Sequence, residues 1–241
     1  MLKLNNISFR VSKEKYILKN INLEIEDGQL LVVTGPNGSG KSTLAKIITG
    51  IYPAASGEIV LNGENITDLD VTCKAKKGIS FSFQRPVCFK GLSVRALLNI
   101  AAGKELTTNE LKSLLDMVGL CIYDYSDREL NSSLSGGELK RIEIASVLAR
   151  HTQLNIFDEP EAGIDLWSFQ KLIEIFGDMK LNSAASQIII SHQKSILEIA
   201  DRIAVIKEGS VVRYGEPAEV LPELFGEDMQ CRCPIRKVCE K

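Results

Sequence analysis

The segment that decides the fold reads Gly35-Pro36-Asn37-Gly38-Ser39-Gly40-Lys41-Ser42-Thr43, and it follows the apolar run 30–33 after a single residue, Thr34. It fits the P-loop pattern G-x-x-x-x-G-K-[ST]. In such a loop the glycines let backbone N–H groups surround a β-phosphate, and the following helix adds the positive end of its dipole. Lys41 would supply a cation to the β- and γ-phosphates, and the Ser42 hydroxyl would bind Mg²⁺. The segment therefore predicts a nucleotide site.

A second polar segment reads Leu154-Asn155-Ile156-Phe157-Asp158-Glu159-Pro160. Its apolar run predicts a buried strand that ends on two carboxylates, at the edge where open α/β sheets bind ligands. Adjacent strand residues point in opposite directions, so the two carboxylates can take two roles. We predict that Asp158 holds the hydration shell of Mg²⁺ and that Glu159 polarises the water that attacks the γ-phosphate.

Around these segments, short apolar runs alternate with segments of helical period, which is the pattern of a layered α/β protein. Alternating hydrophobicity at 2–9, 18–25 and 57–61 predicts an antiparallel β layer. The expected strands of the parallel sheet cover 30–33, 79–81, 154–157, 187–190 and 202–205.

Strand signals are absent between Gln84 and Leu134, where Val94–Ala101 and Asn109–Val118 have helical spacing instead. This stretch predicts a helical lobe inserted at about residues 86–150. The expected fold is therefore an α/β P-loop NTPase, in which a RecA-like parallel sheet core carries an antiparallel β layer and the inserted α-helical lobe.

Composition excludes several classes of protein. The chain has 241 residues, of which 44% are hydrophobic and 25% charged, so it can bury a sizeable core. The net charge of −2 leaves no positive field for nucleic acid. No signal peptide or apolar run long enough for a membrane span is evident, which predicts a cytoplasmic protein without direct membrane insertion, whose six cysteines are reduced.

The segment Leu134-Ser135-Gly136-Gly137-Glu138-Leu139-Lys140-Arg141 opens a helix with apolar residues at helical spacing. On this segment the chain resembles the ATP-binding-cassette family, and the resemblance extends from the N-terminus to about Glu219. In that family the site made by Ser135, Gly136 and Gly137 contacts the γ-phosphate of ATP held by the other subunit. The resemblance implies an ATPase that closes as a head-to-tail dimer on Mg-ATP, with its domain at 1–225 and a C-terminal tail at 226–241.

The same resemblance assigns four further residues to the ATP site. Gln84 matches a glutamine that contacts Mg²⁺ or its water and links the nucleotide to the lobe. His192 matches a histidine that contacts the γ-phosphate and orients the catalytic glutamate, and Asp165 follows the acidic strand. The position expected for an adenine-stacking aromatic is Val11, so Tyr16 is the nearest candidate. The predicted catalytic residues are Glu159, His192 and Lys41, and the predicted Mg²⁺ ligands are Ser42, Gln84 and Asp158.

Three functions stay open. The loop Gly163-Ile164-Asp165 resembles the ATPases of SUF-type iron-sulfur cluster assembly, especially the minimal two-component systems, and implies a soluble scaffold of the SufB type as partner. Alternatively, the chain is the ATP-binding subunit of a membrane importer, and the surface around Arg85, Pro86, Val87 and Phe89 receives a permease helix. A non-hydrolysing dimerisation switch is the third reading, against which Glu159 and His192 argue.

The C-terminal stretch adds three cysteines, Cys231, Cys233 and Cys239, within a short distance. Soft thiolates at short spacing suit zinc or an iron-sulfur species. Three thiols provide one ligand fewer than a closed four-coordinate site needs, however, and a reduced tail is the alternative. The sequence therefore predicts no resident metal site there.

Overall fold

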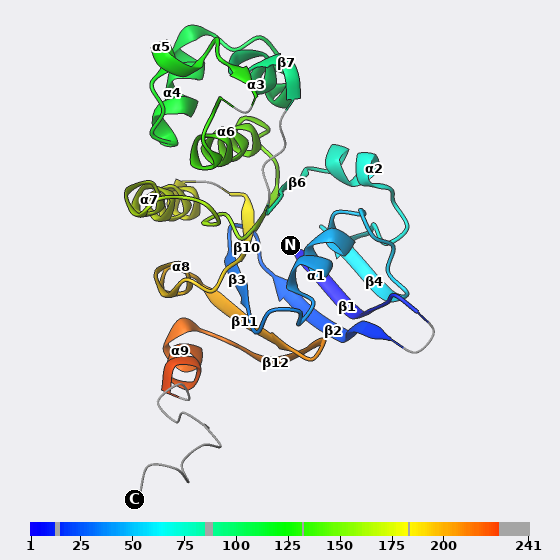
Figure 1. Cartoon of the computed structure of the whole chain (residues 1–241). Coiled ribbons are helices and arrows are strands. Elements are labelled where there is room, and N and C mark those ends of the chain that lie inside the picture. The colour runs from blue at the N-terminus through cyan, green and yellow to red at the C-terminus, as the bar shows by residue number, and fades with distance from the viewer. Residues whose placement is uncertain (13–14, 85–88, 132, 183, 227–241) are drawn as a thin grey trace, which may run out of the picture.

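The computed structural model describes residues 1–12, 15–84, 89–131, 133–182 and 184–226. Figure 1 shows a core built around two β-sheets, and a group of helices that projects from one end of this core. None of the described helices combines the length and the apolar content that crossing a bilayer requires. The predicted division into 1–225 and a tail at 226–241 stays a prediction, because 227–241 lie outside the described residues.

The central sheet has six strands in the order β12-β11-β3-β10-β9-β6. The five strands predicted from the sequence are all present and run parallel to one another. The sixth, β12, pairs antiparallel with β11 at the edge and was not predicted. The strand bounds are β3 (Leu30–Thr34), β6 (Ile79–Ser82), β9 (Leu154–Asp158), β10 (Ser186–Ile190), β11 (Arg202–Lys207) and β12 (Ser210–Gly215).

The second sheet is the predicted antiparallel layer, with the strand order β2-β1-β4-β5. Asn62 and Gly63 have positive φ angles of 51° and 81° in the turn that leads into the short strand β5. Asparagine and glycine tolerate this left-handed region, which is why the pair signals a hairpin in the sequence. The strand bounds are β1 (Leu2–Arg10), β2 (Tyr16–Ile25), β4 (Ser56–Leu61) and β5 (Glu64–Asn65).

The central strands are buried on both faces. Leu31 and Val33 belong to a cluster shared with the antiparallel layer and with helix α1 (Lys41–Ile48). Leu30 and Val32 point the other way, into a cluster shared with α7 (Leu166–Asn182) and the lobe. Burial on both sides explains why these strands read as continuous apolar runs. The remaining core helices are α2 (Val71–Lys76), α8 (Lys194–Glu198) and α9 (Pro217–Gly226).

The inserted lobe contains helices where they were expected, but the expectation that it lacks strands is wrong. Short strands β7 (Phe89–Ser93) and β8 (Glu129–Leu130) pair antiparallel within it. β8 covers only two residues, too few to produce an alternating pattern in the sequence. The lobe helices are α3 (Val94–Ala102), α4 (Thr108–Met117), α5 (Ile122–Tyr125) and α6 (Gly136–Ala149), the last of which runs back to the core (Figure 1).

Candidate functional site

The carboxyl ends of four parallel strands meet at one edge of the central sheet. Ile190 at the end of β10 is in register with Val33 of β3 on one side and with Asp158 of β9 on the other. Ser82 at the end of β6 pairs with Phe157. The P-loop, the acidic pair, His192 and Gln84 each follow one of these strand ends, so the fold brings together residues far apart in the sequence.

The P-loop has a backbone that only glycine allows at two positions. Gly35 has φ 133°, and a Cβ there would lie 2.0 Å from the carbonyl oxygen of Ile206. Gly40, which caps the N-terminus of α1, has φ 106°, and a Cβ there would lie 2.5 Å from Leu18 Cδ2. The glycine spacing of the motif is therefore required by the turn itself.

Lys41 is 5% exposed and folds back over its own loop. Its ammonium donates hydrogen bonds to the carbonyl oxygens of Gly35 at 2.8 Å and Pro36 at 3.1 Å. Burial lowers the pKa of Lys41, and the carboxylates of Glu159 and Asp158 oppose that shift. A buried cation thus lies over the loop, with two acidic groups near enough to interact with it.

Ser42 and Asp158 face each other across the start of α1. The Ser42 hydroxyl donates a hydrogen bond of 2.9 Å to Asp158 Oδ1, and Asp158 is 2% exposed. Burial raises the pKa of Asp158, although the Ser42 bond opposes it. Adjacent hard oxygen donors of this kind suit Mg²⁺. The buried Ser39 hydroxyl has no hydrogen-bond partner in the described part of the chain, which also fits a loop built for a ligand.

Glu159 has an unusual backbone conformation, with φ 46°. This left-handed conformation costs a non-glycine residue about 1–2 kcal/mol. Two backbone hydrogen bonds hold it: Glu159 N donates to Ile190 O and Ala162 N donates to Glu159 O, both at 3.0 Å. The Gln84 amide nitrogen donates to Glu159 Oε2. The structure therefore joins two residues that the sequence predicted separately.

His192 follows β10 in an exposed position. Although the residue is exposed overall, partial desolvation of its imidazole and the nearby Lys41 ammonium lower the pKa of that ring, while Glu159 opposes the shift. Beside it, the buried Ser191 hydroxyl donates a hydrogen bond of 2.6 Å to Glu161 Oε1 and accepts one of 3.0 Å from Gln193 N. Glu161 was missed at the sequence level, because nothing in its position distinguishes it from a solvated loop glutamate.

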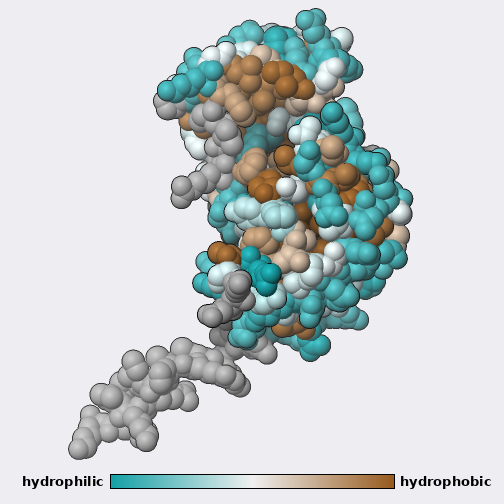
Figure 2. All heavy atoms as spheres, turned by 90° about the vertical axis from the view of Figure 1, so that its right-hand side faces the viewer, coloured by the Kyte–Doolittle hydropathy of each residue, from teal (hydrophilic) through white to brown (hydrophobic). Residues whose placement is uncertain are grey.

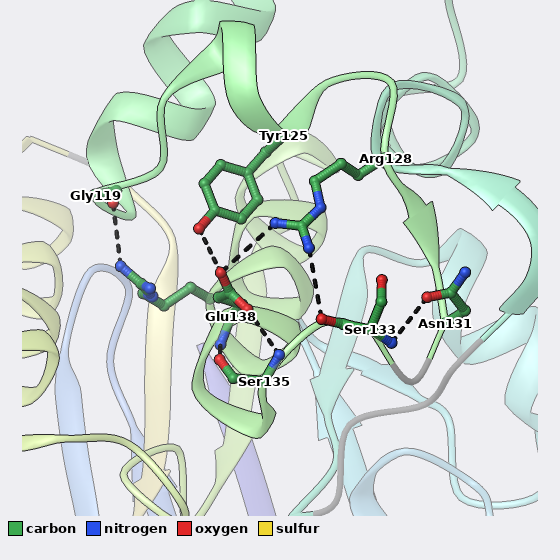
Figure 3. A network of polar contacts seen from close by, with 8 residues as sticks. Gly119, Tyr125, Arg128, Asn131, Ser133, Ser135 and Glu138 are labelled. Carbon is green, nitrogen blue, oxygen red and sulfur yellow. Dashed lines mark hydrogen bonds and ion pairs between the residues drawn. The ribbon is translucent and has the colours of Figure 1, made fainter.

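The Ser135 segment lies in the lobe and begins α6 with a capping box. Ser135 Oγ accepts from Glu138 N at 3.2 Å, and Ser135 N donates to Glu138 Oε2 at 2.7 Å. Glu138 Oε1 also accepts from the Tyr125 hydroxyl and lies 3.8 Å from Arg128 Nη1, as Figure 3 shows. The Ser-x-x-Glu spacing could have identified Glu138 in the sequence; Tyr125 and Arg128 left no such signal.

The remaining predicted residues lie around this edge in different ways. A Cβ on Gly137 would be 3.5 Å from Gly163 O, so the loop that leads to Asp165 packs against the start of α6. The Asp165 carboxylate accepts from Ser168 N at 3.0 Å and from Ser168 Oγ at 2.6 Å, as a helix cap would. Tyr16 is 46% exposed and begins β2, which contacts Gly40 through Leu18. Its assignment to adenine stays a prediction.

Comparison with known proteins identifies the family. A family model described as ABC transporter matches residues 18–162. An uncharacterized ABC transporter ATP-binding protein of Methanocaldococcus jannaschii is 36% identical over 229 residues, covering 91% of this chain and 90% of the relative. An energy-coupling factor transporter ATP-binding protein of Clostridium perfringens is 32% identical, covering 88% and 76%.

Solved structures agree with these relatives. A dimeric post-hydrolysis state of an ATP-binding cassette bound to ADP and phosphate has a TM-score of 0.80 at 26% identity, covering 90% of this chain and 99% of that one. The CbiO1 protein of Clostridium perfringens, part of an ABC transporter complex, has a TM-score of 0.77 at 29% identity, covering 97% and 95%.

The chain belongs to the ABC transporter family. It has the P-loop NTPase fold of an ATP-binding cassette and is an ATPase that binds ATP. The resemblance to the SUF assembly ATPases is not confirmed, because the relatives compared above are described as transporter ATP-binding proteins.

Proposed function

We propose that this chain is the ATP-hydrolysing subunit of a membrane importer and that it works as a head-to-tail dimer. Relatives described as an energy-coupling factor transporter ATP-binding protein and as a sulfate/thiosulfate import ATP-binding protein, each 32% identical to this chain, support the importer reading. The observation that carries it is an apolar groove between core and lobe, which would receive a segment of the permease.

The groove has a volume of about 260 Å³ and opens beside the loop that carries Gln84. Three of its apolar residues are exposed: Phe83 at 40%, Phe89 at 46% and Ile100 at 68%. Figure 2 shows apolar side chains gathered on the lobe, above the waist between lobe and core. Exposed apolar surface of this kind marks an interaction site. Phe89 was predicted on this surface; Arg85, Pro86 and Val87 lie outside the described residues.

Within each subunit, the P-loop residues 35–43 would hold the ATP phosphates, and Tyr16 would contact the adenine. Ser42, Asp158 and Gln84 provide the oxygen donors for Mg²⁺, which would neutralise the β- and γ-phosphates when bound. Glu159 would polarise the attacking water, with His192 and Lys41 contacting the γ-phosphate. The hydrogen bond between Gln84 and Glu159 supports this assignment, because it places the proposed water-polarising group beside a proposed Mg²⁺ ligand.

Across the dimer, Ser135, Gly136 and Gly137 would contact the γ-phosphate held by the other subunit, and Asp165 would lie nearby. The capping box uses Ser135 Oγ as an acceptor and so leaves its O–H available to donate to a phosphate oxygen. The dimeric state of a similar ATP-binding cassette bound to ADP and phosphate supports this arrangement.

A second candidate is an ATPase that remodels a soluble SufB-type scaffold in iron-sulfur cluster assembly. Gly163-Ile164-Asp165 and the cysteines of the C-terminal stretch favour it, and the same groove would serve a scaffold. Cys231, Cys233 and Cys239 lie outside the described residues, so this candidate rests on the sequence. A non-hydrolysing switch does not agree with membership of an ATPase family.

Isolation of the partner tests the proposal. A tagged Glu159→Gln chain would be purified with Mg-ATP from detergent-treated native cells, and the sequence of the co-purifying protein examined for membrane spans. Ile100→Glu should abolish co-purification, whereas Leu181→Glu, a control on α7 whose side chain is 81% exposed, should not. A multi-span partner supports the importer. A soluble partner that co-purifies with Glu159→Gln and is lost with Ile100→Glu supports the scaffold hypothesis and overturns the importer hypothesis.

A further inference from the structure

Helix α6 carries an ion pair that neither the P-loop nor the capping box requires. Lys140 and Glu143 lie on its inner side, with 0% and 15% of their side chains exposed, and Lys140 Nζ is 3.3 Å from Glu143 Oε2. Burial lowers the pKa of the Lys140 ammonium and raises that of the Glu143 carboxyl, and each partner opposes the shift of the other. Charges removed from water in this way must be compensated by well-placed contacts.

The pair holds the main chain of one residue from both sides. Glu143 Oε1 accepts from Phe83 N at 2.7 Å, and Lys140 Nζ donates to Phe83 O. Lys140 Nζ also donates to Ser82 Oγ at 3.2 Å, at the end of β6. The Lys140 donor thus contacts the carbonyl of Phe83 and the Glu143 acceptor contacts its amide, and Phe83 directly precedes Gln84.

This contact lies between three functional elements. Gln84, the next residue along the chain, donates to Glu159. The helix that carries the pair begins at the Ser135 capping box. Phe83 and Glu143 also line the groove proposed for the partner. A shift of the Phe83 peptide therefore changes the position of Gln84 relative to both Glu159 and the start of α6.

We infer that Lys140 and Glu143 are positioning residues that clamp the Phe83 peptide, fix Gln84 against Glu159, and couple the groove and the start of α6 to the hydrolysis site. Apolar side chains of similar volume would fill the same space but would leave the amide and carbonyl of Phe83 without these partners. The inference rests on the roles proposed for Gln84 and Glu159.

A double-mutant cycle with Gln84→Ala tests it. Lys140→Met should lower kcat about tenfold in the native background, within the coupling typical of one hydrogen-bond network, and less than about twofold in the Gln84→Ala background. The dissociation constant for ATP should change less than about twofold, because the P-loop is untouched. Equal losses of kcat in the two backgrounds would overturn the inference, since damage to the fold does not depend on Gln84.

Two further variants separate a clamp from a simple ion pair. The exchange Lys140→Glu with Glu143→Lys keeps the opposite charges but sets acceptor against carbonyl and donor against amide. The exchanged chain should therefore have a kcat as low as that of Lys140→Met. Lys140→Arg, which keeps a donor at this position, should have a kcat near that of the native chain. Restoration by the exchange would show that only the charge pairing matters, and would overturn the clamp.

Lys180 provides the matched control for stability. It pairs with Asp201 at 2.7 Å and donates to Ile199 O at 3.0 Å, while Asp201 accepts from Leu30 N at 2.8 Å, so this pair also holds main chain. Lys180→Met should lower Tm with the same small effect on kcat in both Gln84 backgrounds.

If Gln84→Ala itself leaves kcat unchanged, the proposed site is wrong. If it lowers kcat but the Lys140 effect persists, only the clamp is wrong.

Discussion

The two polar regions of this molecule, the sheet edge and the start of α6, differ in how their hydrogen bonds are used. At the sheet edge, Lys41 bonds to P-loop carbonyls and Ser42 bonds to Asp158, so groups expected to contact Mg-ATP are occupied by one another. At the start of α6, Ser135 and Glu138 satisfy each other's main chain within one helical turn. If the proposed roles hold, the first region has to exchange partners to bind nucleotide, whereas the second can bind without exchanging any.

This difference indicates which region responds to ATP. Exchanging the hydrogen bonds of Lys41 and Ser42 for phosphate and Mg²⁺ costs little, because stronger interactions with charged groups replace the hydrogen bonds that break. A preformed start of α6 adds no reorganisation cost when two subunits close. The conformational change that accompanies ATP binding should therefore start at the sheet edge and move the lobe as a unit.

The largest expected effect is that of Glu159→Gln at the sheet edge. Removal of the proposed water-polarising carboxylate should lower kcat at least about a hundredfold, as for other general bases. ATP binding should persist, since less negative charge then faces the γ-phosphate. Size-exclusion chromatography with Mg-ATP should show a stable dimer. A monomer that still binds ATP would contradict the paired-site arrangement.

Mixed dimers test whether the two regions act across the subunit boundary. Lys41→Ala should weaken nucleotide binding, and Ser135→Arg should block the lobe site, so each homodimer should be inactive. A mixture should regain activity, because one composite site combines the native Lys41 of one chain with the native Ser135 of the other. In an equimolar mixture, recovery should reach about a quarter of the native activity, since random pairing makes about half of the dimers mixed and each of these holds one of two sites intact. Activity of the Ser135→Arg homodimer would exclude the role of Ser135.

The sheet edge was predictable from the sequence because each of its residues follows a strongly apolar strand. Once 30–33, 79–81, 154–157 and 187–190 are read as parallel strands, their carboxyl ends must share an edge. The contacts between these residues were not predictable in the same way. Lys140 is fully buried, yet in the sequence it reads as one more charge on a helix surface, and only the position of β6 relative to α6 reveals its bonds to Ser82 and Phe83.

The lobe was predictable to a lesser extent. Its helices follow from hydrophobic period, but the pairing of β7 with β8 depends on contacts across the whole insertion, which local pattern does not encode. The choice between importer and assembly factor was the least determined by sequence. The choice rested on a few loop residues, whose side chains can be explained by the fold alone. The Asp165 carboxylate, for example, caps α7.

A smaller effect is expected from the capping network of the lobe. Glu138→Ala removes the acceptor for Ser135 N and for the Tyr125 hydroxyl, and should destabilise the lobe by about 1 kcal/mol, as loss of a helix cap does. Turnover should fall through weaker closure of the dimer, whereas ATP binding by the isolated subunit should not change. Tyr125→Phe is the matched control, because it removes one hydrogen bond to Glu138 and leaves the capping box intact. An equal loss of stability in both variants would show that the box itself contributes little.

The smallest expected effect is a difference in pH dependence between the two regions. The pKa of His192 is lowered from 6.5 by burial and by Lys41, so the unfolded chain takes up this proton first as the pH falls. Native stability relative to His192→Gln should therefore decline as the pH falls below about 6.5, by the linkage of proton uptake to unfolding.

The pKa of Glu138 is lowered from 4.5 by its bonds to Tyr125 and Ser135, so its contribution to stability is present above 4.5 and is lost only as the pH falls further. Urea unfolding of the native chain, His192→Gln and Glu138→Gln between about pH 3 and 7.5 should separate the two windows, with the His192 difference appearing first as the pH falls. If the stability difference between the native chain and Glu138→Gln disappears already near pH 6, the hydrogen bonds of the capping box do not hold the Glu138 carboxylate firmly. The start of α6 would then be no more preformed than the sheet edge.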